Sequence, residues 1–416
     1  MAVSSQHRRT ELLQVYQAAL AAVAGEPAVA DWIRQHPLDG EWAVVAVGKA
    51  AAAMAQGAER ELGPQIRSGV VITKYGHGDP RLAAPRWQLL ESGHPVPDDN
   101  SLAAGEALLT YLQSLPDELP LLFLLSGGAS ALVEALPQGM SLADLARTND
   151  WLLGSGLDIA AMNAVRKRLS RIKGGRLLRH LRGRRCLQLL ISDVPGDDLA
   201  TIGSAPLYPS AEQPLPQQLP DWLRALLAQA EAPPANTPQL AAVESHIVAD
   251  NAIARRAARE RVEALGLTVF EHPGHFQGDA EALAEKFVTT LHESGPALHL
   301  WGGESSVTLP GNPGRGGRNQ HLALAAARLI AGEANCLVLA AGTDGSDGPT
   351  GEAGALVDGE TLKRGEEEGL SAAVALRRAD SGTFLEASGD LIETGPTGSN
   401  VMDLVMAWSW DDGSRA

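Results

Sequence analysis

Short, continuous runs of apolar residues alternate with segments of helical periodicity along most of the chain. The strongest runs cover 119–128 and 186–194, and others cover 43–48, 297–303 and 336–345. A strand that is apolar along its whole length, rather than at every second position, is typical of burial on both faces. The pattern therefore predicts an α/β protein whose parallel sheets are covered by helices on both faces.

Further signals complete the predicted order of elements. The first half adds strands at GVVITK and WQLLES, a helix near 101–114 and a long helical stretch over 158–181. The second half adds four strand candidates, namely SHIVAD (245–250), LTVFEH (267–272), TFLEAS (383–388) and DLVMAWSW (403–410).

The first segment admits two interpretations. Arg8 and Arg9 followed by LLQVYQAALAAVAG suggest a signal peptide or a twin-arginine signal. Glu11, Gln14 and Gln17 interrupt the apolar stretch, however, and its apolar residues recur at helical spacing. We therefore predict an amphipathic helix. No run in the sequence approaches the ~20 apolar residues of a membrane span.

A proline-rich break at 209–239 surrounds one short predicted helix. A chain of 416 residues fits two domains better than one core. We predict an N-terminal α/β domain over 1–235 and a C-terminal α/β domain over 240–410, with the break as linker. The last ~15 residues could return to the N-terminal domain.

Charge and cysteine content narrow the function classes. The formal net charge is −16, which argues against nucleic acid or an anionic membrane as the main partner. It favours small-molecule substrates bound in locally basic pockets. Cys186 and Cys336 lie in apolar runs outside any metal-ligand spacing, so we predict buried free thiols and a reducing cytoplasm.

Candidate binding residues gather where predicted strands end and helices begin, the edge at which open α/β sheets bind ligands. Lys49 in VGKA begins a helix, where the dipole favours anions, so it is either turned to solvent or retained by a bound anion. In LLSGGASAL, Ser126, Gly127, Gly128 and Ser130 suit a phosphate or carboxylate, and a serine-capped turn is the alternative.

Two segments follow in the same half of the chain. MNAVRKRLSRIKGGRLLRHLRGRR is mostly a solvated helix face, although its KGG turn could direct Arg166 or Lys173 toward a ligand. Asp193, Asp197 and Asp198 follow the strand CLQLLIS. Carboxylates there suit Mg²⁺ or the positioning of a hydroxyl, and helix capping is the alternative for the latter two.

The stretch GGESSVTLPGNPGRGGRNQHLALAAARL predicts a strand, a glycine-dense loop and a helix. Amides at Gly316 and Gly317 can surround phosphate oxygens, and Arg318 adds a fork of donors that stays charged. Asn319 and Gln320 continue the polar row. A flexible loop with a surface arginine is the alternative.

Asp344 and Asp347 lie in the loop GTDGSDG, where a Mg²⁺–phosphate role and a simple Asp/Gly turn are both open. The spacing is not that of an EF-hand. The sequence contains no GxxxxGK[ST], no GxGxxG after a strand, no GxSxG and no HExxH. These absences argue against a P-loop NTPase, a dinucleotide site, a serine hydrolase elbow and a zincin.

Taken in order, the motifs resemble those of one family. VGKA, LSGGASAL, NAVRKRLSRIKGG, SDVPGDD, GGESSVTLPGNPGRGGRNQ, GTDGSDGPTG and TGPTGSNVMDL are similar to the motifs of type II glycerate kinases, which carry a MOFRL-type C-terminal domain. The resemblance spans about Leu12 to Leu404. It implies a larger Rossmann-like α/β/α N-terminal domain, a smaller α/β C-terminal domain, and an active site in the cleft between them.

The resemblance also implies ATP- and Mg²⁺-dependent phosphorylation of D-glycerate at its 2-hydroxyl. Lys49 and Arg318 match the catalytic basic pair, and Asp193 is the candidate for orienting or deprotonating the hydroxyl. Some of Asp193, Asp344 and Asp347 would hold the metal. Substrate and nucleotide binding is assigned to loop residues, namely Ser126, Gly127, Gly128, Ser130, Lys173, Gly303, Glu304, Gly316, Gly317, Asn319, Gln320 and Asn400.

Two positions depart from the family pattern. Gly351 stands where the family usually has aspartate, and Met402 where it usually has asparagine. These departures leave a non-catalytic sugar-acid or nucleotide-binding homologue open. An NAD(P)H-dependent hydroxypyruvate reductase, a label often given to this family, is the alternative chemistry. The expected partners are D-glycerate and ATP, with no nucleic acid or membrane, and a homo-oligomer is left open.

Overall fold

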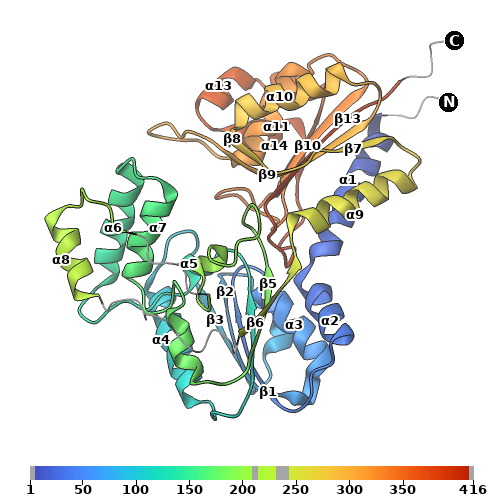
Figure 1. Ribbon diagram of the computed structural model, residues 1–416. Helices are drawn as coiled ribbons and strands as arrows, with labels where there is room; N and C mark the ends of the chain where they lie inside the picture. The colour runs from blue at the N-terminus through green and yellow to red at the C-terminus, as the bar shows by residue number, and fades with distance from the viewer. Residues whose placement is uncertain (1–4, 209–213, 231–242, 412–416) are drawn as a thin grey trace. The chain divides into compact units, whose positions relative to one another are not determined.

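The computed structural model describes residues 5–208, 214–230 and 243–411, and the chain divides into two compact units (Figure 1). The N-terminal unit is continuous, Gly25–Val248. The C-terminal unit combines Met1–Ala24 with Ala249–Ala416. Each unit has its own sheet and its own apolar core.

The N-terminal unit is built on a six-stranded sheet of order β3-β2-β1-β4-β5-β6. Its strands are β1 (Trp42–Val47), β2 (Ile66–Lys74), β3 (Trp87–Ser92), β4 (Leu121–Leu125), β5 (Cys186–Ile191) and β6 (Val243–Ala249). The pairs β1–β2, β1–β4, β2–β3 and β4–β5 are all parallel. Every residue of β1, β4 and β5 is buried, which confirms the prediction from their continuous apolar runs.

Helices cover both faces of this sheet. The helices of this unit are α2 (Gly25–Gln35), α3 (Ala51–Leu62), α4 (Asp99–Ser114), α5 (Ala129–Leu132), α6 (Leu142–Gly154), α7 (Ile159–Arg168) and α8 (Asp221–Gln229). Figure 1 shows α2 and α3 on one side of the strands and α4 on the other. Helices α6, α7 and α8 share a separate small apolar cluster.

The long helix predicted over 158–181 is wrong. Helix α7 ends at Arg168, and a 3₁₀ turn follows at Arg176–Leu181. Between them Gly174 and Gly175 have φ of 65° and 79°, which an α-helix cannot accommodate. The KGG interruption therefore ends the helix and forms a turn.

The C-terminal sheet has the order β12-β11-β10-β13-β9-β7, and β8 also pairs with β9. Its strands are β7 (Val269–Glu271), β8 (Phe276–Asp279), β9 (Leu298–Ser306), β10 (Cys336–Gly342), β11 (Gly354–Asp358), β12 (Leu391–Ile392) and β13 (Asp403–Ser409). Only β7 and β8 run parallel to β9, and the other pairs are antiparallel. The predicted parallel sheet is therefore wrong for this half. Strand β10 is apolar throughout because both faces are covered, whatever the direction of its neighbours.

Helices also cover both faces of the C-terminal sheet (Figure 1). Helices α1 (Ser5–Val23) and α9 (Asn251–Ala264) pack on each other on one face. The other face carries α10 (Ala280–Glu293), α11 (Arg318–Leu329), α12 (Thr361–Glu367), α13 (Ala372–Arg377) and α14 (Ser381–Ser388). The strand predicted at TFLEAS is wrong, because this segment belongs to α14 and buries Phe384 and Leu385 in the core.

Helix α1 is amphipathic, as predicted. Its apolar positions are buried, namely Leu12, Val15, Tyr16, Ala19 and Val23. In the part of the chain that the structure describes, no helix is both long and apolar enough to cross a membrane.

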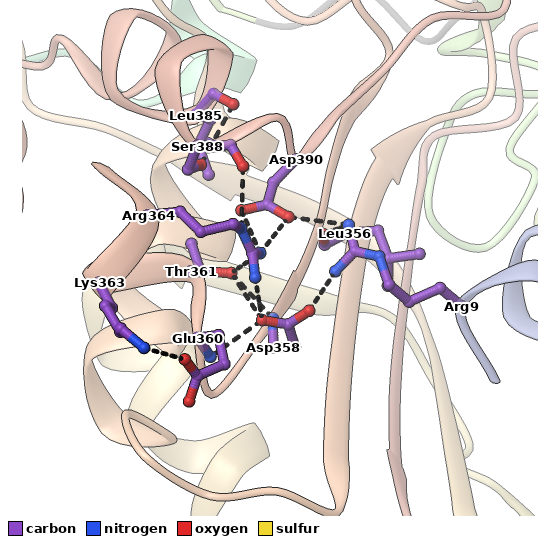
Figure 2. Close-up of polar contacts among 10 residues, drawn as sticks. All are labelled: Arg9, Leu356, Asp358, Glu360, Thr361, Lys363, Arg364, Leu385, Ser388 and Asp390. Carbon is purple, nitrogen blue, oxygen red and sulfur yellow. Dashed lines mark hydrogen bonds and ion pairs between the residues drawn. The ribbon is translucent and has the colours of Figure 1, made fainter. Parts of the chain in front are cut away.

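A network of ion pairs joins α1 to the C-terminal unit (Figure 2). The Arg9 guanidinium donates to Asp358 Oδ2 at 2.7 Å, to Asp390 Oδ1 at 2.8 Å and to the Leu356 carbonyl at 2.8 Å. Arg364 binds the same two carboxylates. Since both aspartates are well buried, their partners compensate for charge that would otherwise be costly.

The two units do not follow the boundaries predicted from the sequence. Helix α1 belongs to the C-terminal unit, although the predicted N-terminal domain began at residue 1. Strand β6 follows the proline-rich break yet lies beside β5 in the first sheet. Strand β13 lies in the middle of the second sheet, so the last strand does not return to the N-terminal unit. Of the predicted linker, 209–213 and 231–239 lie outside the described residues.

Both cysteines are buried and free, as predicted. Burial raises the pKa of the Cys186 and Cys336 thiols to about 12. Because the thiolate is the nucleophile and the metal ligand, neither side chain is poised for chemistry at neutral pH.

Candidate functional site

In the N-terminal unit, the turns that follow β1 and β4 are hydrogen-bonded to each other. The Lys49 amide donates to the Gly127 carbonyl at 2.9 Å, and the Ser126 amide donates to Val47 at 3.0 Å. The Ala50 amide donates to Ser126 Oγ at 3.0 Å. Ser126 is fully buried, and its hydroxyl links the SGGAS turn to Ala50, the residue that precedes α3. Helix α5, which follows the turn, has no side-chain cap, so the serine-capped turn is not observed.

Gly48 makes this close approach possible. Its φ is +128°, and a Cβ at this position would lie 2.2 Å from Ser126 Oγ. Only glycine fits both the backbone conformation and the space. The stem of Lys49 then lies over the SGGAS turn, since a Cβ at Gly128 would come within 2.9 Å of Lys49 Cγ and 3.2 Å of the His94 ring.

The structure therefore brings Lys49, Gly127 and Gly128 together, and it adds His94. The sequence reasoning missed this histidine. It follows β3 at the same edge of the sheet, and that position after a parallel strand is the signal that could have identified it.

The loop after β5 lies against the same turn and carries Asp193. Ser204 Oγ donates to Ser130 Oγ at 3.0 Å. Asp198 accepts hydrogen bonds from the Ala200 amide and the Thr201 hydroxyl, both at 3.0 Å, so its carboxylate is held within an Asp turn. It does not cap the short 3₁₀ helix that follows at Ile202–Ser204. Asp193 is half-buried at the carboxyl end of β5, next to β4 in the sheet.

Lys173 has a role inside the fold. It is 5% exposed, and its Nζ donates to Glu134 Oε2 at 2.5 Å. The other oxygen of the buried Glu134 accepts from Ser170 Oγ at 2.5 Å. Losing the ammonium would leave an uncompensated buried carboxylate. This geometry gives no support to the prediction that Lys173 contacts a ligand.

In the C-terminal unit, Arg318 begins α11 and is held by two carboxylates. Its Nε donates to Asp403 Oδ2 at 2.6 Å and its Nη2 to Asp403 Oδ1 at 2.9 Å. Its Nη1 lies 2.8 Å from Glu304 Oε1. Burial opposes the charge on Arg318, but the Asp403 carboxylate outweighs burial and raises the pKa of the guanidinium. Arg318 is therefore a permanent cation in a fixed orientation.

Asp403 was missed as a site residue, although it fixes Arg318. It is 1% exposed and begins β13 between Gly303 of β9 and Gly342 of β10. Its position at a strand end was visible in the sequence, but the bidentate contact spans 85 residues and left no local signal. Glu304 contacts Arg318, and its assignment to ligand binding stays a prediction.

Asp347 occupies the N-terminus of α11. One carboxylate oxygen accepts from the Asn319 amide at 3.1 Å, and the other accepts from the Gln320 amide at 2.8 Å. A Cβ at Gly317 would lie 2.2 Å from Asp347 Cγ, so glycine is required here too. The protein's own carboxylate therefore takes the amides of Asn319 and Gln320. That the amides of Gly316 and Gly317 surround a phosphate stays a prediction.

Asp347 has an unusual proton affinity. Burial raises its pKa to about 7, and the Asp403 charge adds to the effect. The two backbone amides and the Arg318 charge act in the opposite direction. Around neutral pH this carboxyl group therefore exists in both its charged and neutral forms.

Tyr16 lies close to three carboxylates, those of Asp344, Asp347 and Asp403. Asp344 Oδ1 accepts from the Ser346 amide at 3.0 Å and from the Ser346 hydroxyl at 3.1 Å, as in a simple Asp turn. The Tyr16 hydroxyl, from α1, donates to the Gly342 carbonyl at 2.6 Å. Burial, followed by the charges of Asp344, Asp403 and Asp347, raises the pKa of Tyr16, which stays neutral.

The two positions that depart from the family pattern, Gly351 and Met402, have different surroundings in the structure. A Cβ at Gly351 would meet nothing within 4 Å, so the larger family residue would fit there. Met402 is buried and has φ +69°, which asparagine adopts more readily than methionine. Next to it, Val401 donates its amide to Thr343 Oγ1 at 2.8 Å, and Asn400 is buried beside this contact.

The predicted magnesium ligands come from both units of the chain. Asp193 belongs to the N-terminal unit, and Asp344 and Asp347 belong to the C-terminal unit. Among the residues described, no three His, Cys, Asp or Glu side chains are grouped to hold a metal ion. The carboxylate of Asp347 already accepts hydrogen bonds from α11.

Fold and site together define a class of protein. One α/β unit presents a lysine over a glycine–serine turn, and a second α/β unit presents an arginine where a glycine-rich loop meets a helix. This is a two-unit α/β protein with features suited to anionic small molecules.

Comparison with known proteins identifies the family. Residues 11–234 match a domain of unknown function, DUF4147, and residues 297–403 match the MOFRL family. D-glycerate 2-kinase of Thermotoga maritima is 35% identical over 407 residues, covering 95% of this chain and 96% of that protein. A putative hydroxypyruvate reductase of Agrobacterium vitis is 36% identical over 417 residues, covering 95% and 93%.

A solved structure agrees with the sequence comparison. The crystal structure of glycerate kinase from Thermotoga maritima superposes with a TM-score of 0.84 at 33% identity, covering 97% of this chain and 100% of that one. The chain therefore belongs to the glycerate kinase family that combines a DUF4147 and a MOFRL domain. The resemblance found in the motifs is confirmed.

Proposed function

We propose that this protein is a kinase that transfers the γ-phosphoryl group of ATP to the 2-hydroxyl of D-glycerate, giving 2-phosphoglycerate and ADP. Membership of the glycerate kinase family supports the reaction class. The observation that carries the proposal is the orientation of Arg318. Buried Asp403 fixes two of its nitrogens, and its Nη1 faces Glu304, whose side chain is 47% exposed.

Phosphoryl transfer explains why such a cation is needed. The bond from the γ-phosphorus to the oxygen that bridges it to the β-phosphate breaks. The 2-hydroxyl oxygen bonds to that phosphorus and gives up its proton, for which Asp193 is the proposed acceptor. Negative charge spreads over the phosphoryl oxygens, and catalysis depends on positioning and electrostatic stabilisation. A preoriented guanidinium supplies both without reorganisation.

Lys49 is the proposed second cation. Its position over the SGGAS turn gives it backbone amides and a neighbouring histidine as surroundings. The proposal requires Lys49 and Arg318, which belong to different units, to reach one phosphoryl group during the reaction, as the resemblance implies. The Mg²⁺ that the resemblance also implies stays a prediction, and none of the roles proposed for Arg318, Lys49 and Asp193 rests on it.

Product analysis tests the proposed function. The protein is incubated with ATP and D-glycerate, and phosphorus NMR distinguishes 2-phosphoglycerate from 3-phosphoglycerate. In parallel, hydroxypyruvate and NADH are supplied and NADH absorbance is followed. We expect 2-phosphoglycerate and no enzyme-dependent loss of NADH. Rapid NADH oxidation without glycerate-dependent ATP consumption would overturn the proposal in favour of the reductase.

A further inference from the structure

A pocket of about 360 Å³ adjoins Arg318 within the C-terminal unit. Its walls come from the end of β9, the loop before α11, the first turns of α11 and the loop around 348–349. The lining is mostly apolar side chains and glycine backbone, namely Val307, Leu309, Pro313, Gly314, Gly316, Gly317, Gly348, Pro349 and Ala379. Polar groups are few, namely Arg318, His321, Ser305 and Ser306.

One polar group of this lining has an unmet hydrogen bond. Ser305 is 5% exposed, and its Oγ has no hydrogen-bond partner among the residues that the structure describes. A buried hydroxyl without a partner costs free energy that a ligand could recover. Leu309 is 64% exposed and adds an apolar side chain to the lining.

The two substrates of the proposed reaction differ in the pocket they need. Every carbon of glycerate carries oxygen, so it offers no apolar face to Val307, Leu309 or Pro349. It would also leave most of 360 Å³ unfilled. A nucleoside has a flat apolar base and a ribose with hydroxyl groups, and this volume lies in the range of pockets for such ligands.

We propose that this pocket binds the base and ribose of the nucleotide, with the phosphate chain directed to Arg318. The inference rests on the proposed kinase function. Val307, Leu309 and the two prolines contact the base, and Ser305 binds a hydroxyl or ring nitrogen. Because Asp347 occupies the α11 amides, the phosphates bind Arg318 Nη1 in place of Glu304, not the helix terminus.

Equilibrium binding separates the nucleoside part of the site from its phosphate part. Adenosine, ADP and tripolyphosphate serve as probes in calorimetry with the wild type, Leu309→Ala and Ser305→Ala. We expect Leu309→Ala to weaken adenosine and ADP about tenfold and Ser305→Ala about fivefold. Neither variant should change binding of tripolyphosphate, which reaches Arg318 alone. Leu329→Ala, at a half-exposed leucine at the end of α11, is the matched control and should bind all three normally.

Steady-state kinetics distinguish this inference from the kinase proposal. The KM for ATP should rise in Leu309→Ala and Ser305→Ala while the KM for D-glycerate stays constant. An inactive wild type would contradict the proposed kinase function. The pocket assignment would then depend on the adenosine binding measurements alone. An active wild type whose variants keep their affinity for adenosine and ADP would overturn the pocket assignment. A rise confined to the KM for D-glycerate would assign the pocket to the sugar acid instead.

Discussion

At the residue scale, Arg318 and Asp403 behave as one group. Asp403 is buried, and Arg318 supplies both of the hydrogen bonds that compensate its charge. Removing one half of such a pair leaves the other charge buried without a partner.

We predict that Arg318→Ala lowers turnover about 10³-fold or more, the range attributed to arginines that stabilise phosphoryl transfer. It should also lower the free energy of unfolding by about 2–3 kcal/mol, less than a fully buried pair because Arg318 is partly exposed. Arg318→Lys should restore little activity, since a point charge cannot hold Asp403 in two-point contact. Assays and urea unfolding check these effects. Wild-type turnover in Arg318→Ala would exclude the residue from the site.

Asp347 predicts a pH dependence of stability. Its pKa is about 7 in the folded protein and close to 3.8 when unfolded, so between these values the folded state holds a proton that the unfolded state releases. Stability from this group is therefore complete below about pH 4 and is lost as pH rises toward 7, with a slope approaching 1.4 kcal/mol per pH unit.

Urea unfolding between these pH values measures that slope. Asp347→Asn removes the titrating group while retaining an acceptor oxygen, so its curve should be flatter than that of the wild type. Other carboxyl groups contribute equally to both proteins and cancel in the difference. Identical slopes in the two proteins would show that Asp347 keeps an ordinary pKa in the fold.

Which site residues could be predicted depended on where their partners lie in the sequence. Lys49 and Arg318 were named as candidates because a charged residue beside glycines at a strand–helix junction is a local pattern. The partnership of Asp403 with Arg318 was not found, because the pairing depends on the register of β13 against β9. Tyr16 left no signal either, since a tyrosine on the apolar face of a helix looks like core.

At the element scale, burial was easier to predict than strand direction. The apolar runs located β1, β4, β5, β9 and β10 correctly because each is covered on both faces. The same runs could not reveal that β10 pairs antiparallel with both of its neighbours. Hydrophobic patterning shows whether one or both faces of a strand are buried, and burial on both faces does not by itself fix the direction of the adjacent strands.

We predict that the turn between β1 and α3 does not tolerate a side chain at Gly48. In Gly48→Ala the new Cβ would overlap the Ser126 hydroxyl and carbonyl, at 2.2 and 2.5 Å, and would also impose an alanine at φ +128°. We expect a loss of about 3 kcal/mol or more in the free energy of unfolding. Gly76→Ala is the control, because Gly76 has φ +74° but no atom within 4 Å of an added Cβ.

Gly76→Ala should therefore cost only the backbone strain, about 1 kcal/mol. The difference between the two variants in chemical denaturation isolates the packing contribution from the conformational one. Gly48→Ala should also weaken Lys49-dependent activity, since the turn that carries the lysine must move. Equal stability of the two variants would mean that the β1 and β4 turns have room to separate.

At the scale of the whole molecule, the sequence predicted two α/β domains but not how the chain divides between them. The proline-rich break is a genuine feature of composition, yet β6 returns to the first sheet after it. Helix α1 packs on α9, more than two hundred residues away, because its apolar face matches that helix and its Arg9 matches buried Asp358 and Asp390. The surface that a segment packs against, and not its position in the sequence, therefore decides which unit it joins.

This arrangement predicts that α1 and the C-terminal unit lose structure together. Leu12→Ala empties a fully buried position of α1 and should destabilise that unit by about 3 kcal/mol. Hydrogen–deuterium exchange should then rise in peptides from α9 and β13 and stay unchanged in β1 and β4. Leu108→Ala in α4, equally buried in the other core, should give the opposite pattern. Faster exchange of β1 and β4 in Leu12→Ala would place the helix with the N-terminal unit, as the sequence had suggested.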